Sequence, residues 1–222
     1  MQVQPIFISA TGTDVGKTCT AVQLIDRLGR SGIRVGACKP IETGVGNVPA
    51  DAARLLEAVQ RYNPAFATFE AHDLCAYTFL LPAAPFCADK AATISLDKIF
   101  DKIRQLQSHC DLLIIEGAGG LMVPILSDYM MIDLARDIGG HILLVVSSEL
   151  GGINATLLSL EMLKSRQLPF DWCVNLYRNR ESFDRVSRPY YDAAFPDEWW
   201  TLQEGLDTFL KHFLNRSPLG IR

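Results

Sequence analysis

The sequence lacks several features that mark particular classes of protein. Its six cysteines form no C-x-x-C pair, so the spacing expected of zinc ligands is absent. A net charge of −4 and a pI of about 5.6 argue against a general nucleic-acid-binding surface. No apolar stretch approaches the length of a membrane span. We therefore expect no nucleic-acid partner and no association with a membrane.

The first residues of the sequence also predict no targeting signal. The segment MQVQPIFIS has no basic region and only a short apolar run, so it does not resemble a signal peptide. A cytoplasmic enzyme or binding protein is the resulting expectation. Several cysteines lie in apolar runs, where a free thiol behaves as a small hydrophobic group. We expect all six to be reduced core residues, namely Cys19, Cys38, Cys75, Cys87, Cys110 and Cys173.

What is present is a regular alternation of short apolar runs and longer amphipathic patterns. With 222 residues, 49% of them hydrophobic, the chain can bury a full core. Strands are predicted over residues 5–9, 34–39, 111–117, 141–148 and 171–176. Helices are predicted over residues 20–32, 50–62, 95–110, 131–139, 153–167 and 202–214. Residues 64–94 contain three prolines and show no clear periodicity.

This alternation predicts an α/β fold, with a mostly parallel sheet and helices on both of its faces. The runs 111–117 and 141–148 are continuously apolar, as in parallel strands covered on both sides. No repeat or linker interrupts the chain, so we expect one domain over residues 1–222. Because ligands of such sheets bind beyond the carboxyl ends of the strands, the residues that follow each strand are the first site candidates.

The stretch ATGTDVGKT, which follows the first predicted strand, resembles a phosphate-binding loop with altered spacing. The usual pattern G-x-x-x-x-G-K-[ST] requires glycine at position 11, but Thr11 stands there and Gly12 comes one residue late. Lys17 could reach terminal phosphates, and the Thr18 hydroxyl could bind Mg²⁺. Backbone amides at the start of the next helix would favour an anion. The alternative is a glycine turn followed by a surface lysine.

Charged residues at other strand ends extend this pattern. Glu116 ends the strand predicted over 111–117, where its carboxylate could bind or support Mg²⁺, or could serve as a turn acid. Lys39 ends the second strand and could neutralise an anionic co-substrate, or could be a solvated surface lysine. Asp51 opens the next helix, where the helix dipole alone also favours an acid.

Six segments taken together resemble the dethiobiotin synthetase family. They are ATGTDVGKT, CKPIETG, PADAARL, IIEGAGGLMVPI, ELGGINATLLS and VNL, in the family's order and at about its spacing over residues 8–176. The family's loop has an extra residue between its first glycine and GKT, and Ala10 replaces that glycine here.

The resemblance implies a P-loop NTPase-like fold and a ligase of biotin biosynthesis. The implied reaction joins CO₂ to 7,8-diaminononanoate and closes the ring with ATP and Mg²⁺, through a carbamate and a carbamic-phosphoric anhydride. The products would be dethiobiotin, ADP and phosphate.

The resemblance also implies roles for individual residues. Catalytic roles fall on Lys17, Lys39 and Thr13, and Mg²⁺ binding falls on Thr18, Asp51 and Glu116. The nucleotide would contact Asp14, Val15, Gly16, Lys17, Thr18, Cys19, Asp51, Glu116, Gly117, Ala118, Gly119, Asn175 and Leu176. The substrate would contact Lys39, Thr43, Leu150, Gly151, Gly152, Ile153 and Asn154, the last five from the other subunit of a homodimer.

Two other functions remain open from the sequence. An ATP-driven switch of the partition or septum-positioning type shares the sheet and the loop, but usually carries a lysine where Gly12 stands here. A nucleotide-binding scaffold without catalysis would not need the full set of Lys17, Thr18, Asp51 and Glu116. The tail also departs from the family, because it has no isoleucine-proline pair to pack on the nucleotide.

Overall fold

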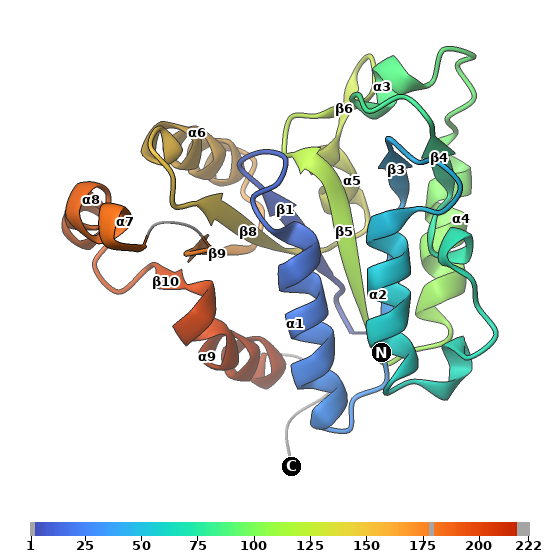
Figure 1. Cartoon of the computed structure of the whole chain (residues 1–222), viewed down its shortest axis with the longest axis horizontal. Helices are drawn as coiled ribbons and strands as arrows, with labels where there is room; N and C mark the ends of the chain where they lie inside the picture. Colours follow the sequence, from blue (N-terminus) through green and yellow to red (C-terminus); the bar gives the residue numbers. More distant parts are fainter. Residues whose placement is uncertain (1–2, 178–179, 217–222) are drawn as a thin grey trace.

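A parallel sheet of six strands runs through the centre of the structure, a computed structural model that describes residues 3–177 and 180–216 (Figure 1). The strand order is β10-β9-β8-β1-β5-β2, and each neighbouring pair is parallel. The strands are β1 (Ile6–Ala10), β2 (Val35–Cys38), β5 (Leu112–Gly120), β8 (His141–Ser147), β9 (Phe170–Asn175) and β10 (Trp200–Thr201).

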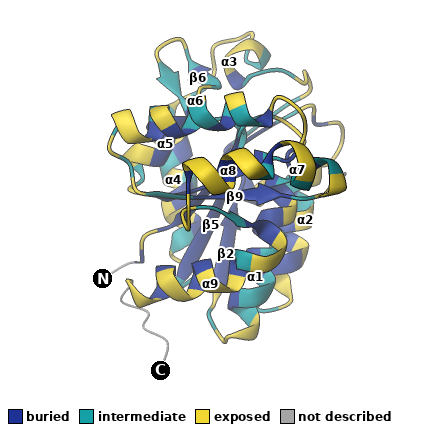
Figure 2. Cartoon of the chain, turned by 90° about the vertical axis from the view of Figure 1, so that its left-hand side faces the viewer, coloured by how far each residue is buried: buried dark blue, intermediate teal, exposed yellow. Residues whose placement is uncertain are grey.

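Helices cover both faces of this sheet (Figures 1 and 2). One face carries α1 (Lys17–Arg30), α2 (Ala50–Gln60) and α9 (Leu202–Asn215), and the other carries α4 (Leu96–Gln107), α5 (Met131–Asp137) and α6 (Gly152–Ser165). Each helix turns its buried residues toward the sheet and its exposed ones outward (Figure 2). The predicted fold class, a mostly parallel α/β sheet with helices on both faces, is confirmed.

Smaller elements complete the chain at the ends of the sheet. The segment without clear periodicity holds two 3₁₀ turns (Pro64–Phe66 and Ala71–Leu74), β4 (Tyr77–Phe79) and the short helix α3 (Pro85–Ala88). β4 pairs with β3 (Ile41–Thr43), while β6 (Pro124–Leu126) pairs with β7 (Tyr129–Met130). Near the C-terminus, α7 (Arg180–Val186) and α8 (Arg188–Ala194) precede β10.

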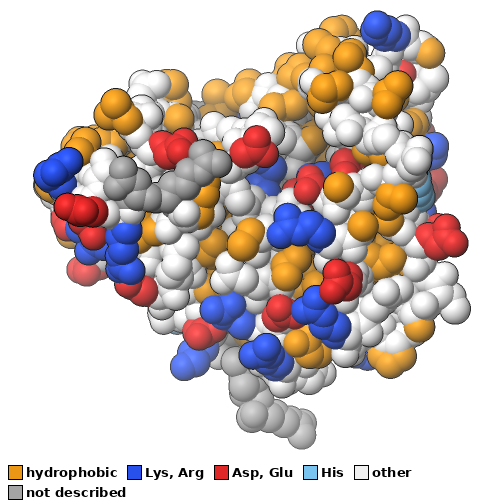
Figure 3. Space-filling model, viewed as in Figure 1, with side chains coloured by type: hydrophobic (Ala, Val, Ile, Leu, Met, Phe, Trp, Pro, Cys, Tyr) orange, Lys and Arg blue, Asp and Glu red, His pale blue; other side chains and the backbone are white. Residues whose placement is uncertain are grey.

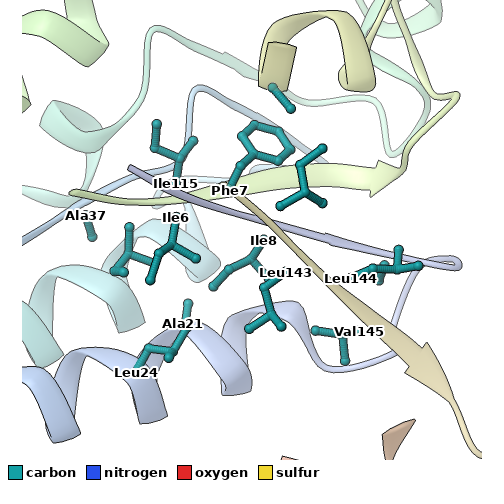
Figure 4. Packing of buried hydrophobic residues seen from close by; sticks show 14 of the residues in the cluster. Ile6, Phe7, Ile8, Ala21, Leu24, Ala37, Ile115, Leu143, Leu144 and Val145 are labelled. Carbon is teal, nitrogen blue, oxygen red and sulfur yellow. The ribbon is translucent and has the colours of Figure 1, made fainter. Parts of the chain in front are cut away.

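The core is densest around β1, because this strand is covered on both faces. Ile6, Phe7 and Ile8 are fully buried. Ile6 and Ile8 point toward α1, where Ala21 and Leu24 lie, whereas Phe7 points to the opposite side of the sheet (Figure 4). A strand covered on both faces favours apolar side chains, which explains the apolar run at residues 6–8; the buried Ser9 is the polar exception in β1.

The expectation that all six cysteines are core residues is wrong. Cys38, Cys75 and Cys173 are buried, but Cys110 is half-buried, and Cys19 and Cys87 are exposed. All six are free thiols, as expected. Cys19 lies in the first turn of α1, on the side that faces a cleft rather than the sheet. An apolar neighbourhood in the sequence does not determine which face of a helix a small residue occupies.

The strand order places one loop at a reversal point of the sheet. β1 lies between β5 and β8, and the chain continues to β2 beyond β5 on one side and to β9 and β10 on the other. Such a reversal opens a crevice at the carboxyl ends of the strands. The loop of residues 11–16, which joins β1 to α1, lies at this crevice. Within the described residues, no helix is both long enough and apolar enough to cross a membrane.

Candidate functional site

The loop of residues 11–16 has the backbone shape of an anion-binding turn. Asp14 and Gly16 both adopt positive φ angles, of 57° and 105°. A side chain on Gly16 would also meet the Asn175 amide nitrogen, at 2.3 Å from its Cβ. α1 begins immediately afterwards at Lys17, so the amides of its first turn lack partners within the helix. These amides and the positive end of the helix dipole favour a phosphate at this point.

Lys17 lies over this loop and is only 7% exposed. Its Nζ donates a hydrogen bond to the carbonyl oxygen of Gly12 at 2.9 Å. Burial, reinforced by the nearby charge of Lys39, lowers the pKa of Lys17 to about 8. An incoming anion would favour the charged form of this amine, because an opposite charge raises the pKa of a lysine. Lys17 is therefore placed to hold phosphate oxygens.

A buried polar cluster lies beside the loop and joins three elements. Lys39 Nζ, just after β2, lies 2.6 Å from Glu116 Oε1 in β5 and 3.0 Å from Asp51 Oδ2 in α2. Lys39 is 3% exposed and Glu116 is 1% exposed. Burial alone opposes the charged amine, but Glu116 and Asp51 outweigh it and raise the pKa of Lys39. Lys39 therefore remains a cation in a poorly hydrated site, where its field is strong.

Oxygen atoms of the same cluster suit a divalent cation. Thr18 Oγ1 lies 3.0 Å from Asp51 Oδ1 and 2.9 Å from Glu116 Oε1, so one hydroxyl hydrogen faces two carboxylates. Among the described residues, Glu116 Oε2 is buried without a hydrogen-bond partner. The partial burial of Asp51 opposes ionisation of its carboxyl group. Lys39 and Thr18 outweigh this effect and hold the pKa of Asp51 below its usual range. Two carboxylates and a hydroxyl fit Mg²⁺, which takes few protein ligands when phosphates supply the others. The part of the chain that the structure describes contains no metal-binding group of three or more His, Cys, Asp and Glu.

These groups line one cleft of about 670 Å³ at the carboxyl ends of the strands. In the space-filling view, acidic and basic side chains gather where α1 and α2 begin, beneath the lobe that carries α3 and β6 (Figure 3). The cleft brings together most of the predicted site residues. They are Thr13, Asp14, Gly16, Lys17, Thr18, Cys19, Lys39, Thr43, Asp51, Glu116, Ala118 and Gly119.

The remaining predicted residues lie elsewhere. Val15 and Gly117 are not part of the lining, since Val15 is buried beneath the loop and Gly117 lies within β5 against Phe7. Residues 150–154 span the turn before α6 and its first residues, and they do not line the cleft of their own chain. Asn175 is the last residue of β9, and Leu176 follows it, on the other side of the loop. Their predicted contacts with nucleotide and substrate stay predictions.

Asn175 has a structural role that the sequence did not indicate. It is 3% exposed, and its Nδ2 donates to the carbonyl oxygen of Val15 at 2.9 Å. Its Oδ1 accepts a hydrogen bond from Gln203 Nε2 at 3.1 Å, and Gln203 Oε1 accepts one from the Leu176 amide at 3.2 Å. The carboxamide therefore ties the phosphate-binding loop to the start of α9. One N–H and one lone pair of the amide remain for a ligand.

Glu42 is a second residue that sequence reasoning missed. Its carboxylate accepts hydrogen bonds from the backbone amides of Asp51 and Ala52 at 3.0 and 2.9 Å. It thereby caps α2 and holds Asp51 in place, which makes it a positioning residue. A local capping box spans only three residues, whereas Glu42 lies nine residues before Asp51. Its place in the segment CKPIETG, beside Lys39, was the only available signal.

Similarity to known proteins adds independent information. A family model described as an AAA domain matches residues 4–174. The ATP-dependent dethiobiotin synthetase BioD of Sulfurovum sp. (strain NBC37-1) is 52% identical over 206 residues, which are 93% of this chain and 98% of that protein. The protein of the same name from Wolinella succinogenes is 38% identical over 216 residues, 96% of this chain and 99% of its own length.

Solved structures show the same architecture at much lower identity. A plasmid partition protein from Borrelia burgdorferi superimposes with a TM-score of 0.59 over 96% of this chain and 100% of that one, at 12% identity. At this identity the likeness concerns the fold alone, and it confirms an α/β P-loop fold. The partition-type proteins thus share the scaffold, whereas the synthetases share the sequence.

Proposed function

This chain belongs to the dethiobiotin synthetase family, and from that premise we propose how its cleft carries out the ATP-dependent synthesis of dethiobiotin in biotin biosynthesis. The observation that supports the proposal best is the meeting of Lys17, Lys39 and the oxygens of Thr18, Asp51 and Glu116 in one cleft. Two cations and a set of hard oxygen ligands suit a triphosphate beside a second anionic reactant.

We propose that the nucleotide phosphates lie on the loop of residues 11–16. The first-turn amides of α1 and the Lys17 ammonium would bind the terminal phosphates. Thr18, Asp51 and Glu116 would hold Mg²⁺, which neutralises charge on the phosphate oxygens when bound. Lys39 would add a second positive charge on the other side of the cluster, where its amine faces the carboxylates of Asp51 and Glu116.

The chemistry proposed for the diamine needs positioning rather than a protein nucleophile. One amine of 7,8-diaminononanoate adds to CO₂ and loses a proton, which gives a carbamate. A carbamate oxygen attacks the γ-phosphorus and ADP leaves, which gives the mixed anhydride. The second amine then attacks the carbonyl carbon and loses a proton, the ring closes, and phosphate leaves with the bond electrons. Lys17 and Lys39 stabilise the charge that develops on the transferred group, while the hydroxyls of Thr13 and Thr43 orient the carbamate or phosphate oxygens.

The first prediction is that ADP release depends on both co-substrates. With ATP, Mg²⁺, bicarbonate and 7,8-diaminononanoate together, the purified protein should release ADP and dethiobiotin in equal amounts, because phosphoryl transfer needs the carbamate as acceptor. Omission of either bicarbonate or diamine should reduce ADP release to background. Mass spectrometry and a coupled ADP assay measure the two products. ATP hydrolysis that DNA or lipid vesicles stimulate without the diamine would instead support the partition-type switch.

We also propose that the substrate site is shared between two copies of the chain. A second, mainly apolar cleft of about 480 Å³ lies between the loop and α6, and Leu158 and Met122 in its lining are 65% and 48% exposed. Leu150, just before α6, is 92% exposed. A second copy on this face would cover these side chains and bring the start of its own α6 to the substrate.

The second prediction concerns this assembly. The wild-type protein should sediment at twice the chain mass of 24.6 kDa, and Leu158→Glu should shift it toward the monomer by placing a charge in the apolar contact. The matched control is Val186→Glu, at a 49% exposed position on α7, which should leave the dimer intact. Analytical ultracentrifugation measures both. A wild-type protein that stays monomeric at assay concentrations would contradict the shared site.

A further inference from the structure

Arg54 lines the main cleft, although the sequence reasoning gave it no role. It lies on α2 three residues after Asp51, and residues three apart share one face of a helix. Helical side chains also lean toward the N-terminus of their helix, which here carries Asp51. The lining of the cleft accordingly includes Arg54 together with Lys17, Thr18 and Asp51. Its side chain is exposed at the mouth of the cleft.

The other two cations of the cleft each donate to groups of the protein. Lys17 Nζ donates to the Gly12 carbonyl oxygen, and Lys39 Nζ is paired with Glu116 and Asp51. Among the described residues, Arg54 makes neither a hydrogen bond nor an ion pair. Its neighbour on the same helix face, Asp51, directs its carboxylate to Thr18 and Lys39 instead. Among the described residues, Arg54 is thus the cation of the cleft with every donor open to a ligand.

The net charge of the side chains that line the cleft is negative, even with the Arg54 guanidinium included. Four carboxylates line it, those of Asp14, Glu42, Asp51 and Glu116, against three cations. The side chains therefore sum to one negative charge with Arg54 and to two without it. A triphosphate adds several negative charges to a site that is not positive by itself. Every fixed cation near the phosphates consequently has a large effect on binding.

We propose that Arg54 is a further nucleotide-binding residue, whose guanidinium binds the terminal phosphates of ATP at the mouth of the cleft. The inference rests on the proposed placement of the phosphates over the loop of residues 11–16. Guanidinium presents parallel N–H donors that match two phosphate oxygens, and it stays charged at every relevant pH. Arg54 closes the solvent side of the phosphates, while Lys17 and Lys39 contact them from within.

Steady-state kinetics of Arg54→Ala test the proposal. The KM for ATP should rise about tenfold or more, as for the loss of a charge-assisted hydrogen bond, while the KM for the diamine stays within twofold. Arg54→Lys, which keeps the charge but not the paired donors, should fall between the wild type and Arg54→Ala. The control is Arg61→Ala at the end of the same helix, where the arginine pairs with Asp26 and Glu57 away from the cleft.

Direct binding separates this inference from the proposed function. Calorimetry with a non-hydrolysable ATP analogue and Mg²⁺ should show the same loss of affinity for Arg54→Ala, with a melting temperature equal to that of the wild type. An affinity within twofold of the wild type, or an equal rise in the KM for the diamine, would overturn the role of Arg54. If the wild type bound the analogue but made no dethiobiotin, the proposed function would fail while the Arg54 result would still be readable.

Discussion

Replacing Lys39 with methionine is expected to lower kcat by about 10²- to 10³-fold, the range seen when one preorganised donor to transition-state charge is removed. Methionine keeps the length of the side chain but removes its charge. Because Lys39 is 3% exposed and its amine lies 2.6 Å from Glu116, water cannot readily replace it. The measurement is kcat at saturating ATP, bicarbonate and diamine. A kcat within tenfold of the wild type would show that Lys39 does not stabilise the transferred group.

The same change should destabilise the fold, since it leaves the Glu116 carboxylate buried without its cation. Breaking a buried pair from one side costs about 3–5 kcal/mol of unfolding free energy. The double variant Lys39→Met with Glu116→Gln removes both charges and should recover most of that loss in a denaturant titration. It should remain as inactive as the single variant. Stability and catalysis can in this way be separated, and recovery of turnover in the double variant would contradict a catalytic role for Lys39.

Lys17→Ala is expected to reduce kcat/KM for ATP by about 10³-fold, because the amine is the closest cation to the loop that would hold the phosphates. Among the residues that the structure describes, its only hydrogen bond is to the Gly12 carbonyl oxygen, so the fold should tolerate its loss. Circular dichroism and the melting temperature are therefore expected to match the wild type. Steady-state kinetics with varied ATP provide the measurement.

Two further variants sharpen this test. Lys17→Arg should not restore turnover, because the larger planar guanidinium does not fit a site in which the whole Lys17 residue is only 7% exposed. Lys211→Ala, in the exposed part of α9, serves as the matched loss of a lysine and should retain full activity. Turnover by Lys17→Ala above one tenth of the wild-type value would remove Lys17 from the mechanism.

Five strands of the main sheet, all except β10, were predictable because they are largely buried and therefore appear as mainly apolar runs. The short elements were not, since β3, β4, β6, β7 and β10 have only two or three residues each and show no period. The first helix begins at Lys17, three residues before the predicted start, because its first turn is built from the polar GKT segment. Residues 64–94 form turns whose shape depends on β3, with which β4 pairs.

The same contrast holds for the site. Lys17, Thr18, Lys39 and Glu116 could be found from the sequence. Each lies at the end of a predicted strand or in the segment after it, and parallel strands bring their carboxyl ends to one edge of the sheet. Glu42, Arg54 and Gln203 could not be found in this way. The roles of Glu42 and Gln203 depend on the groups that they contact in the folded chain, and the role of Arg54 depends on its having no such contact among the described residues. No short-range sequence pattern predicts these contacts.

The sequence itself thus determined the order of the main strands and helices, the phosphate-binding loop and the family. All three depend on local periodicity and on the spacing of a few segments. Only the tertiary structure decided which charges are paired. Lys39 and Glu116 are 77 residues apart in the chain and 2.6 Å apart in space. The free energy of a charge depends on burial and on distance to other charges, and both quantities exist only after the chain has folded.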